Sequence, residues 1–256
     1  MKHSVPMLWH AFGLVLLFCA IQTAPAATLN LAVADSTCDA MKQVGELYSA
    51  KNPVQFNFIC KSSGLLAKGM RGGALNADIF VSADREWMDF AVDNGLVAPE
   101  QVVSPWGNTL VVATAKANGL RLSNWQDLAS DKVSAILIGD PGTAPFGRYA
   151  KQALESSGLW DRVKKKIETR KNISLLAESL ESANASTVGL LFKTHLTGQL
   201  RTLLTVDRDW HPPIRYFLAP VKASASQAET ARFIRFIQGK EARAVFRSEG
   251  FELADD

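Results

Sequence analysis

The feature that most constrains the fold is a repeated change from a strand pattern to a helix pattern, with hydroxyl side chains between the two. An alternating apolar run over residues 29–33 ends at a polar cluster around Ser36, and helical spacing of apolar residues follows at once. A second alternating run, over residues 54–60, ends near Ser63 and again leads into a helical pattern. Strands that alternate with helices predict an α/β fold with mainly parallel sheets and helices on both faces.

The same order continues along the rest of the chain, without a Gly/Ser linker or a low-complexity segment. Apolar runs predict further strands at 79–81, 110–113, 135–138, 188–192 and 216–221, and helical spacing predicts helices at 87–92, 148–156, 233–238 and 242–248. The α/β pattern therefore covers the whole chain beyond its first residues.

Two serines stand where such a fold binds ligands. In an open α/β sheet the ligand crevice lies beyond the carboxyl ends of the strands. Ser36 and Ser63 each follow a strand and precede a helix, where unpaired backbone N–H groups and the helix dipole favour an anion. Helix capping is the alternative, because a serine at a helix start also satisfies unpaired N–H groups when no ligand is present.

A glycine-rich turn over residues 139–147 offers a third helix start to the same crevice. Its glycine spacing matches neither the Walker motif nor the Rossmann motif, and the Lys-Ser/Thr ending of the Walker motif is absent. Nucleotide binding is therefore not expected.

The first 26 residues have the pattern of a secretory signal peptide. An apolar run of 11 residues, Ala11 to Ile21, is followed by Ala24-Pro25-Ala26, which has the small-x-small pattern of a cleavage site. The run is shorter than the about 20 residues that a transmembrane helix needs. We therefore predict cleavage after Ala26 and export of the mature chain.

The charge of the expected mature chain gives no basis for binding nucleic acid. Residues 1–26 hold one of the 28 Lys and Arg residues and none of the 25 acidic residues, which leaves 27 basic against 25 acidic residues. A net charge near +2 without a long basic block does not attract a polyanion.

The mature chain also lacks the usual signatures of an enzyme. Its two histidines, His195 and His211, are far apart and have no metal-ligand spacing. Neither Ser36 nor Ser63 stands in a G-x-S-x-G motif. We therefore predict neither hydrolase nor zinc chemistry.

Three segments of the chain are distinctive together, namely ADIFVSADREWMDFAVDNGLV, GNTLVVATAKA and IGDPGTAPFGRYAKQALESSGLWD. With them the chain, from about Leu29 to Phe251, closely resembles the periplasmic molybdate-binding proteins that serve ABC importers. It implies a type II periplasmic binding protein, with two α/β lobes and a ligand cleft between them. On this model, lobe one is 27–107 plus 208–256, and lobe two is 108–207.

The resemblance also implies a ligand and the residues that hold it. The family binds a tetrahedral oxyanion, molybdate or tungstate, through neutral donors, without direct ligands to the metal and without a cofactor. Carried over by position, the donors are the hydroxyls of Ser36 and Ser63 and the backbone N–H groups of Phe146 and Ile173. A fifth donor, a tyrosine hydroxyl in the family, falls on Phe192, so this donor is missing here.

The family pattern further implies the membrane permease of an ABC importer as a partner, and we expect a monomer. Besides Phe192, the charged residues Asp35, Lys61 and Arg148 replace the small neutral residues expected near the contacts. Sulfate, phosphate, a phosphonate or a small carboxylate are therefore alternatives to molybdate and tungstate. An exported interaction protein that has lost its ligand is a third interpretation.

Two cysteines remain in the mature chain, in a compartment where disulfides persist. Cys38 follows Ser36 by two residues, and Cys60 precedes Ser63 by three, so both lie at the carboxyl ends of strands that we expect to be neighbours. A disulfide that braces the two ligand loops and a pair of reduced, buried thiols are both compatible with these positions.

Overall fold

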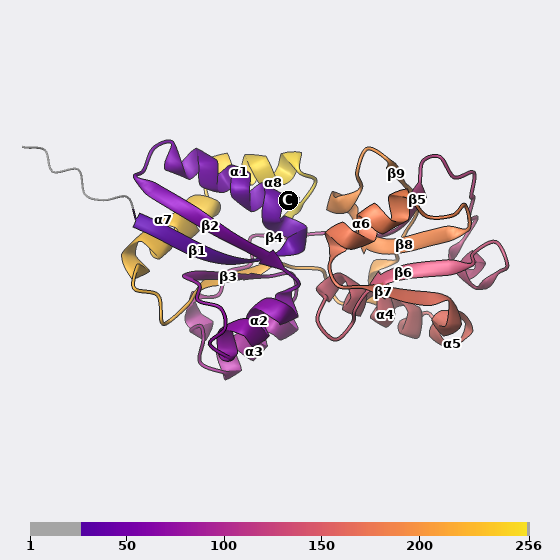
Figure 1. Cartoon of the computed structure of the whole chain (residues 1–256), viewed down its shortest axis with the longest axis horizontal. Coiled ribbons are helices and arrows are strands. Elements are labelled where there is room, and N and C mark those ends of the chain that lie inside the picture. Colours follow the sequence, from indigo (N-terminus) through magenta and orange to yellow (C-terminus); the bar gives the residue numbers. More distant parts are fainter. Residues whose placement is uncertain (1–26, 255–256) are drawn as a thin grey trace, which may run out of the picture.

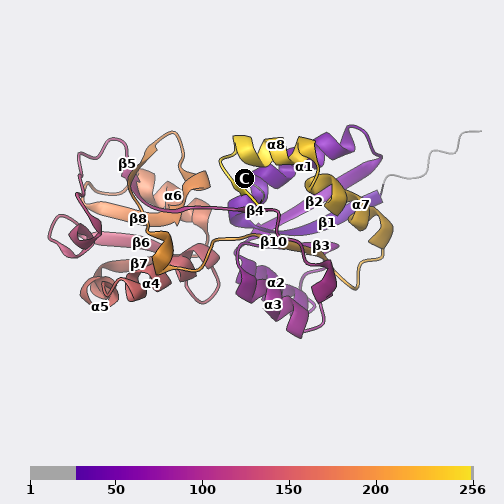
Figure 2. The ribbon, with the colours of Figure 1, turned by 180° about the vertical axis from the view of Figure 1, so that it is seen from behind.

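The computed structural model describes residues 27–254, which form two α/β lobes lying side by side (Figures 1 and 2). Each lobe is built on one main sheet. The predicted signal peptide, residues 1–26, lies outside the described residues. Within the described part, the helices are too short or too polar to cross a bilayer.

The first lobe contains a four-stranded sheet with the order β10-β3-β1-β2. Its strands are β1 (Ala27–Ala34), β2 (Val54–Lys61), β3 (Ile79–Ser82) and β10 (Phe217–Pro220). Its helices are α1 (Cys38–Ser49), α2 (Ser63–Arg71), α3 (Arg85–Asp93), α7 (Gln227–Ile237) and α8 (Lys240–Ser248), and a small second sheet pairs β4 (Trp106–Gly107) with β11 (Glu252–Leu253). Strand β1 is parallel to both of its neighbours, β2 and β3, whereas β10 is antiparallel to β3.

Both faces of this sheet are covered, which explains why residues 31–34 at the end of β1 are apolar without interruption. Helices α1, α7 and α8 lie over one face, and α2 and α3 lie over the other (Figure 1). Leu31 and Val33 belong to the core beside α1 and α7, whereas Ala32 packs with Leu66 and Met88 on the opposite face. A strand buried from both sides needs apolar residues at successive positions.

The second lobe contains a five-stranded sheet with the order β7-β6-β8-β5-β9. Its strands are β5 (Leu110–Ala115), β6 (Ala135–Gly139), β7 (Ile167–Arg170), β8 (Thr187–Phe192) and β9 (Leu200–Thr205), and its helices are α4 (Pro145–Ser156), α5 (Trp160–Val163) and α6 (Ile173–Glu181). Strand β6 is parallel to β7 and β8, whereas β5 is antiparallel to β8 and β9, so this sheet is mixed. Short 3-10 helices span Asp35–Thr37, Pro99–Gln101, Trp125–Ala129, Lys164–Lys166, Lys193–His195 and Arg208–Trp210.

The chain passes between the lobes twice, once from β4 to β5 and once from β9 to β10 (Figure 2). The turns after β1 and β2 in the first lobe contact the segments at the starts of α4 and α6 in the second. This arrangement confirms the predicted α/β fold with two lobes and places several helix starts at the boundary between them.

Candidate functional site

The facing turns of the two lobes enclose one small cavity. Its lining residues come from both lobes and are Ala34, Asp35, Ser36, Ser62, Ser63, Ala83, Pro145, Phe146, Ile173 and Phe192. All five residues predicted to hold a ligand are among them. The volume in which the centre of a water molecule fits is about 10 Å³, which is room for about one water. A larger anion therefore requires the walls to move apart.

A wider hollow of about 510 Å³ lies beside the two crossing segments. Its walls come from residues 108–110, from residues between 208 and 215, and from residues 252–254. Its lining includes both partners of the ion pair between Arg208 and Glu252. None of its lining residues begins an α-helix. Since helix starts supply the unpaired N–H groups that favour an anion, the small cavity is the better candidate site.

Ser63 is fully buried at the start of α2, and its hydroxyl does not cap the helix. Its Oγ instead accepts a hydrogen bond of 3.0 Å from the backbone N–H of Ala83. A serine hydroxyl has one proton, and an oxygen that already accepts leaves that proton for another partner. The structure therefore argues against the capping interpretation and leaves Ser63 able to donate into the cavity.

Ser36 has a similar arrangement in the 3-10 helix between β1 and α1. Its Oγ accepts a hydrogen bond of 2.8 Å from the hydroxyl of Tyr216. No side chain caps either this short helix or α1. The proton of Ser36 is therefore also available to the cavity.

Phe146 and Ile173 present backbone N–H groups from the second lobe. Phe146 is the second residue of α4 and Ile173 the first residue of α6, positions where the N–H has no partner within the helix. Neither N–H donates to an acceptor among residues 27–254. Gly147 allows α4 to approach this closely, because a Cβ there would lie 2.1 Å from the carbonyl oxygen of Gly139 at the end of β6.

Phe192 places an apolar ring where the family resemblance implies a tyrosine. It is the last residue of β8 and is fully buried. Its ring packs against Phe146, Tyr149 and Tyr216, with centroid distances of 6.2, 6.2 and 6.1 Å. The ring lines the cavity without a donor, so the predicted contacts supply two hydroxyls and two helix-start N–H groups.

The two cations near the predicted contacts do not line the cavity. The side chain of Lys61 is exposed. The guanidinium of Arg148, on α4, lies 2.6 Å from the carboxylate of Asp84 and 2.9 Å from that of Glu86, both in the first lobe. Burial raises the pKa of Asp84 to about 6, although the positive charge of Arg148 opposes this shift.

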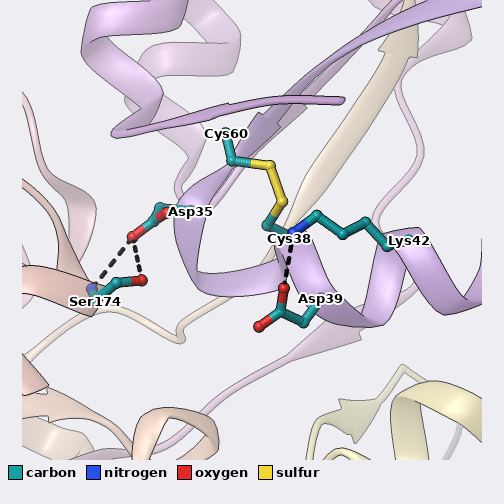
Figure 3. The surroundings of a disulfide bond; sticks show 6 residues. All are labelled: Asp35, Cys38, Asp39, Lys42, Cys60 and Ser174. Atoms are coloured by element: carbon teal, nitrogen blue, oxygen red, sulfur yellow. Dashed lines mark hydrogen bonds and ion pairs between the residues drawn. A yellow bond between two sulfur atoms is a disulfide. The ribbon is translucent and has the colours of Figure 1, made fainter. Parts of the chain in front are cut away.

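Asp35 is the one charged residue of the lining. Its Oδ2 accepts hydrogen bonds from the backbone N–H and from the Oγ of Ser174, at 3.2 and 2.8 Å (Figure 3). Ser174 is the second residue of α6, so the carboxylate is held at a helix amino end that belongs to the opposite lobe.

Further hydrogen bonds join the lobes beside the cavity. The N–H of Gly64 donates to the carbonyl oxygen of Thr143 at 3.0 Å, and the hydroxyl of Ser62 donates to the carbonyl oxygen of Lys171. Together with the contacts of Asp35 and Arg148, they hold the cleft closed in this structure.

A disulfide joins Cys38 and Cys60, whose Cα atoms are 6.0 Å apart (Figure 3). Strands β1 and β2 are neighbours, and Val33 pairs with Cys60 in their register. Of the two alternatives left open by the sequence, the structure has the disulfide. It ties the first turn of α1 to the end of β2, and so connects the segments that carry Ser36 and Ser63.

Comparison with known proteins establishes the family. A family model described as bacterial extracellular solute-binding protein matches residues 29–252. The chain belongs to this family. This solute-binding protein is 32% identical to the molybdate-binding protein ModA of Haemophilus influenzae, over 89% of its own length and 91% of the relative.

Two solved structures show the same fold at lower identity. The periplasmic molybdate-binding protein of Azotobacter vinelandii matches with a TM-score of 0.77 at 19% identity, covering 87% of the solute-binding protein and 98% of that chain. The sulfate-binding protein SubI of Mycobacterium tuberculosis matches with a TM-score of 0.76 at 14% identity, covering 90% and 88% of the two chains. The resemblance seen in the sequence is thus confirmed, and the chain is a solute-binding protein rather than an enzyme.

Sequence reasoning missed three features of the solute-binding protein's cavity. Tyr216 supports Ser36 from the second crossing segment, Ala83 supports Ser63 from the end of β3, and Asp35 bonds across the cleft to Ser174. Only the contact of Asp35 had a signal in the sequence, namely a charge where the family pattern has a small neutral residue. The other two depend on how distant segments meet.

Proposed function

We propose that this chain captures a tetrahedral oxyanion, molybdate or tungstate, in the periplasm and delivers it to the membrane permease of an ABC importer. The observation that carries the proposal is the convergence of Ser36, Ser63, Phe146 and Ile173 on one cavity between the lobes. The names of its ModA relatives support molybdate as the ligand. The proposal includes cleavage of the signal peptide after Ala26, a monomeric protein, and no cofactor besides the ligand.

Neutral donors are able to hold a doubly charged anion in such a place. In a closed cleft with little water, each N–H or O–H dipole acts in a low dielectric, so several aimed donors replace the hydration of the anion without a formal countercharge. The amino ends of α4 and α6 add their dipoles. The negative charge of Asp35 is opposed by its two hydrogen bonds to Ser174.

A lining of donors also discriminates between anions. A protonated oxyanion carries an O–H group that needs an acceptor, and leaving that group unpaired in a buried site costs about 1–3 kcal/mol. The four predicted contacts therefore favour the fully deprotonated anion, whereas the carboxylate of Asp35, which also lines the cavity, would be able to accept from a protonated one.

Binding and delivery are coupled through closure of the lobes. The anion contacts donors from both lobes, so it favours the closed form by the contacts that exist only there. The permease then recognises the closed surface and accepts the anion when the lobes separate.

Sulfate is the second candidate ligand. The cavity is small, and Phe192 lacks the hydroxyl that the family pattern uses for molybdate. A smaller tetrahedral anion would require less widening of the cavity. The sulfate-binding protein SubI shares the fold, so the fold alone does not separate the two anions.

Parallel calorimetric titrations test the proposal. The mature protein, residues 27–256, is titrated with molybdate, tungstate, sulfate and phosphate under the same conditions. We expect saturable heats for molybdate and tungstate at micromolar protein, with much weaker sulfate and phosphate binding. A saturable heat of binding for sulfate, with none for molybdate, would favour sulfate as the ligand. No heat and no change of melting temperature with all four anions would support an exported protein without an oxyanion ligand.

A further inference from the structure

The direction of the hydroxyl of Ser36 is set by a series of hydrogen bonds that starts at a backbone amide. The N–H of Thr109 can only donate, and it donates to Oδ1 of Asn108 at 2.9 Å. This contact fixes which end of the Asn108 amide is oxygen, so the other end, Nδ2, must donate. Nδ2 donates to the hydroxyl oxygen of Tyr216 at 3.2 Å and to Oγ1 of Thr194 at 2.9 Å.

Tyr216 transmits this direction to the cavity. Burial raises the pKa of Tyr216, so its hydroxyl keeps its one proton at neutral pH. Because its oxygen already accepts from Asn108, that proton is donated to Oγ of Ser36 at 2.8 Å. Tyr216 is fully buried, which keeps solvent from supplying a competing partner to its hydroxyl.

We infer that Asn108 and Tyr216 are positioning residues that make Ser36 a hydrogen-bond donor toward the cavity. Since Oγ of Ser36 accepts from Tyr216, its own proton is left for the oxyanion. Asn108 lies on the first crossing segment and Tyr216 on the second, so the series draws on both connections between the lobes. This inference rests on the proposed function, because it requires an oxyanion in the cavity.

Two nearly isosteric substitutions separate this role from packing. In Asn108→Asp, one carboxylate oxygen still accepts from Thr109, but the other now accepts from Tyr216, which reverses the series. Ser36 then donates to Tyr216 and turns its proton away from the cavity. The hydroxyl of Thr194 is able to donate to the new carboxylate. Tyr216→Phe keeps the ring but removes the connection, so that Ser36 is free to rotate.

The test is a double-mutant cycle with molybdate as the probe, or with whichever of the four anions binds the unaltered protein. We expect Tyr216→Phe to weaken binding by about 3- to 10-fold, the range of one neutral hydrogen bond, and Asn108→Asp to weaken it by more than about 10-fold. The added charge of Asn108→Asp acts in both backgrounds. The reversed direction of the hydrogen bonds reaches Ser36 only through Tyr216. The loss of affinity caused by Asn108→Asp should therefore be at least about 5-fold smaller in the Tyr216→Phe background than in the unaltered protein.

Equal losses in the two backgrounds would overturn the inference and leave the anion site itself intact. If Asn108→Asp does not fold, as judged by its thermal melting curve, Tyr216→Phe alone decides, and an unchanged affinity in that variant overturns the inference. Failure of the unaltered protein to bind any of the four anions would overturn the proposed function and this inference together.

Discussion

Ser36 and Ser63 reach the same hydrogen-bonding state through different partners. The backbone N–H of Ala83 donates to Ser63, and the hydroxyl of Tyr216 donates to Ser36. In both cases a buried donor occupies the oxygen, and the proton is left for the cavity. The anion would therefore meet hydrogen atoms from both hydroxyls.

Removing one of these hydroxyls should weaken the anion without unfolding the protein. We expect Ser63→Ala to reduce molybdate affinity by roughly 1 to 3 kcal/mol in calorimetric titrations, because one buried anion oxygen loses its donor. Ser82→Ala is a matched control, since Ser82 is also fully buried and hydrogen-bonded but does not line the cavity. Equal losses of affinity in the two variants would remove Ser63 from the site.

The missing tyrosine hydroxyl suggests the opposite experiment. Phe192→Tyr should tighten molybdate binding by about 0.5 to 1.5 kcal/mol, because a fifth neutral donor then reaches the anion. Phe192→Leu, which removes the ring and adds no donor, should not tighten it. If the tyrosine variant binds no better than the unaltered protein, the cavity has no room for the family's fifth contact.

Among the elements, those with a clear change of period could be predicted from sequence. The strands β1 and β2 and the helices that follow them were found because alternation gives way to helical spacing at a polar turn. The first turn of α4 was missed: the predicted helix starts at residue 148, whereas α4 begins at Pro145. Proline with its fixed φ is favoured in a first helical turn, but it adds nothing to apolar spacing.

The candidate site could be predicted only in part, for a physical reason. Ser36 and Ser63 follow strands, so the ends of those strands locate them. Tyr216 and Asn108 lie on the crossing segments, and their contact with Ser36 depends on how the two lobes meet. The hydrophobic pattern specifies which face of an element is buried, but it does not specify the placement of one sheet against another.

The disulfide between α1 and β2 should contribute to stability. It closes a loop with a sequence separation of 22 residues, and for loops of this size the loss of entropy in the unfolded chain corresponds to about 3 kcal/mol. We expect the double substitution Cys38→Ser and Cys60→Ser to lower the free energy of unfolding by about 2 to 4 kcal/mol in urea titrations. Reductant should have a similar effect on the unaltered protein and none on the variant. A loss below about 0.5 kcal/mol would contradict a stabilising disulfide.

For the molecule as a whole, the burial of Asp84, at its contact with Arg148 of the other lobe, predicts a dependence of stability on pH. The pKa of Asp84 is raised from 3.8 to about 6 by burial. Between these values the folded protein binds a proton that the unfolded chain has released, so the stabilising contribution of the protonated form is lost as pH rises. The difference corresponds to about 3 kcal/mol at most.

Denaturant unfolding at several pH values from about 4 to 7 checks this prediction. Relative to Asp84→Asn, the unaltered protein should lose free energy of unfolding as pH increases across this range. Most other titrating groups are common to both proteins, so their effects largely cancel in the difference. Parallel curves for the two proteins would mean that the pKa of Asp84 is not raised.

The central claim, that donors from both lobes surround an oxyanion, is tested most directly by locating the metal of bound molybdate. Crystals of the mature protein grown with molybdate, measured at the molybdenum absorption edge, give an anomalous peak at its position. We predict one peak in the cavity bounded by Ser36, Ser63, Phe146 and Ile173. A peak elsewhere, or an empty cavity at a molybdate concentration that gives a binding heat in solution, would contradict the account.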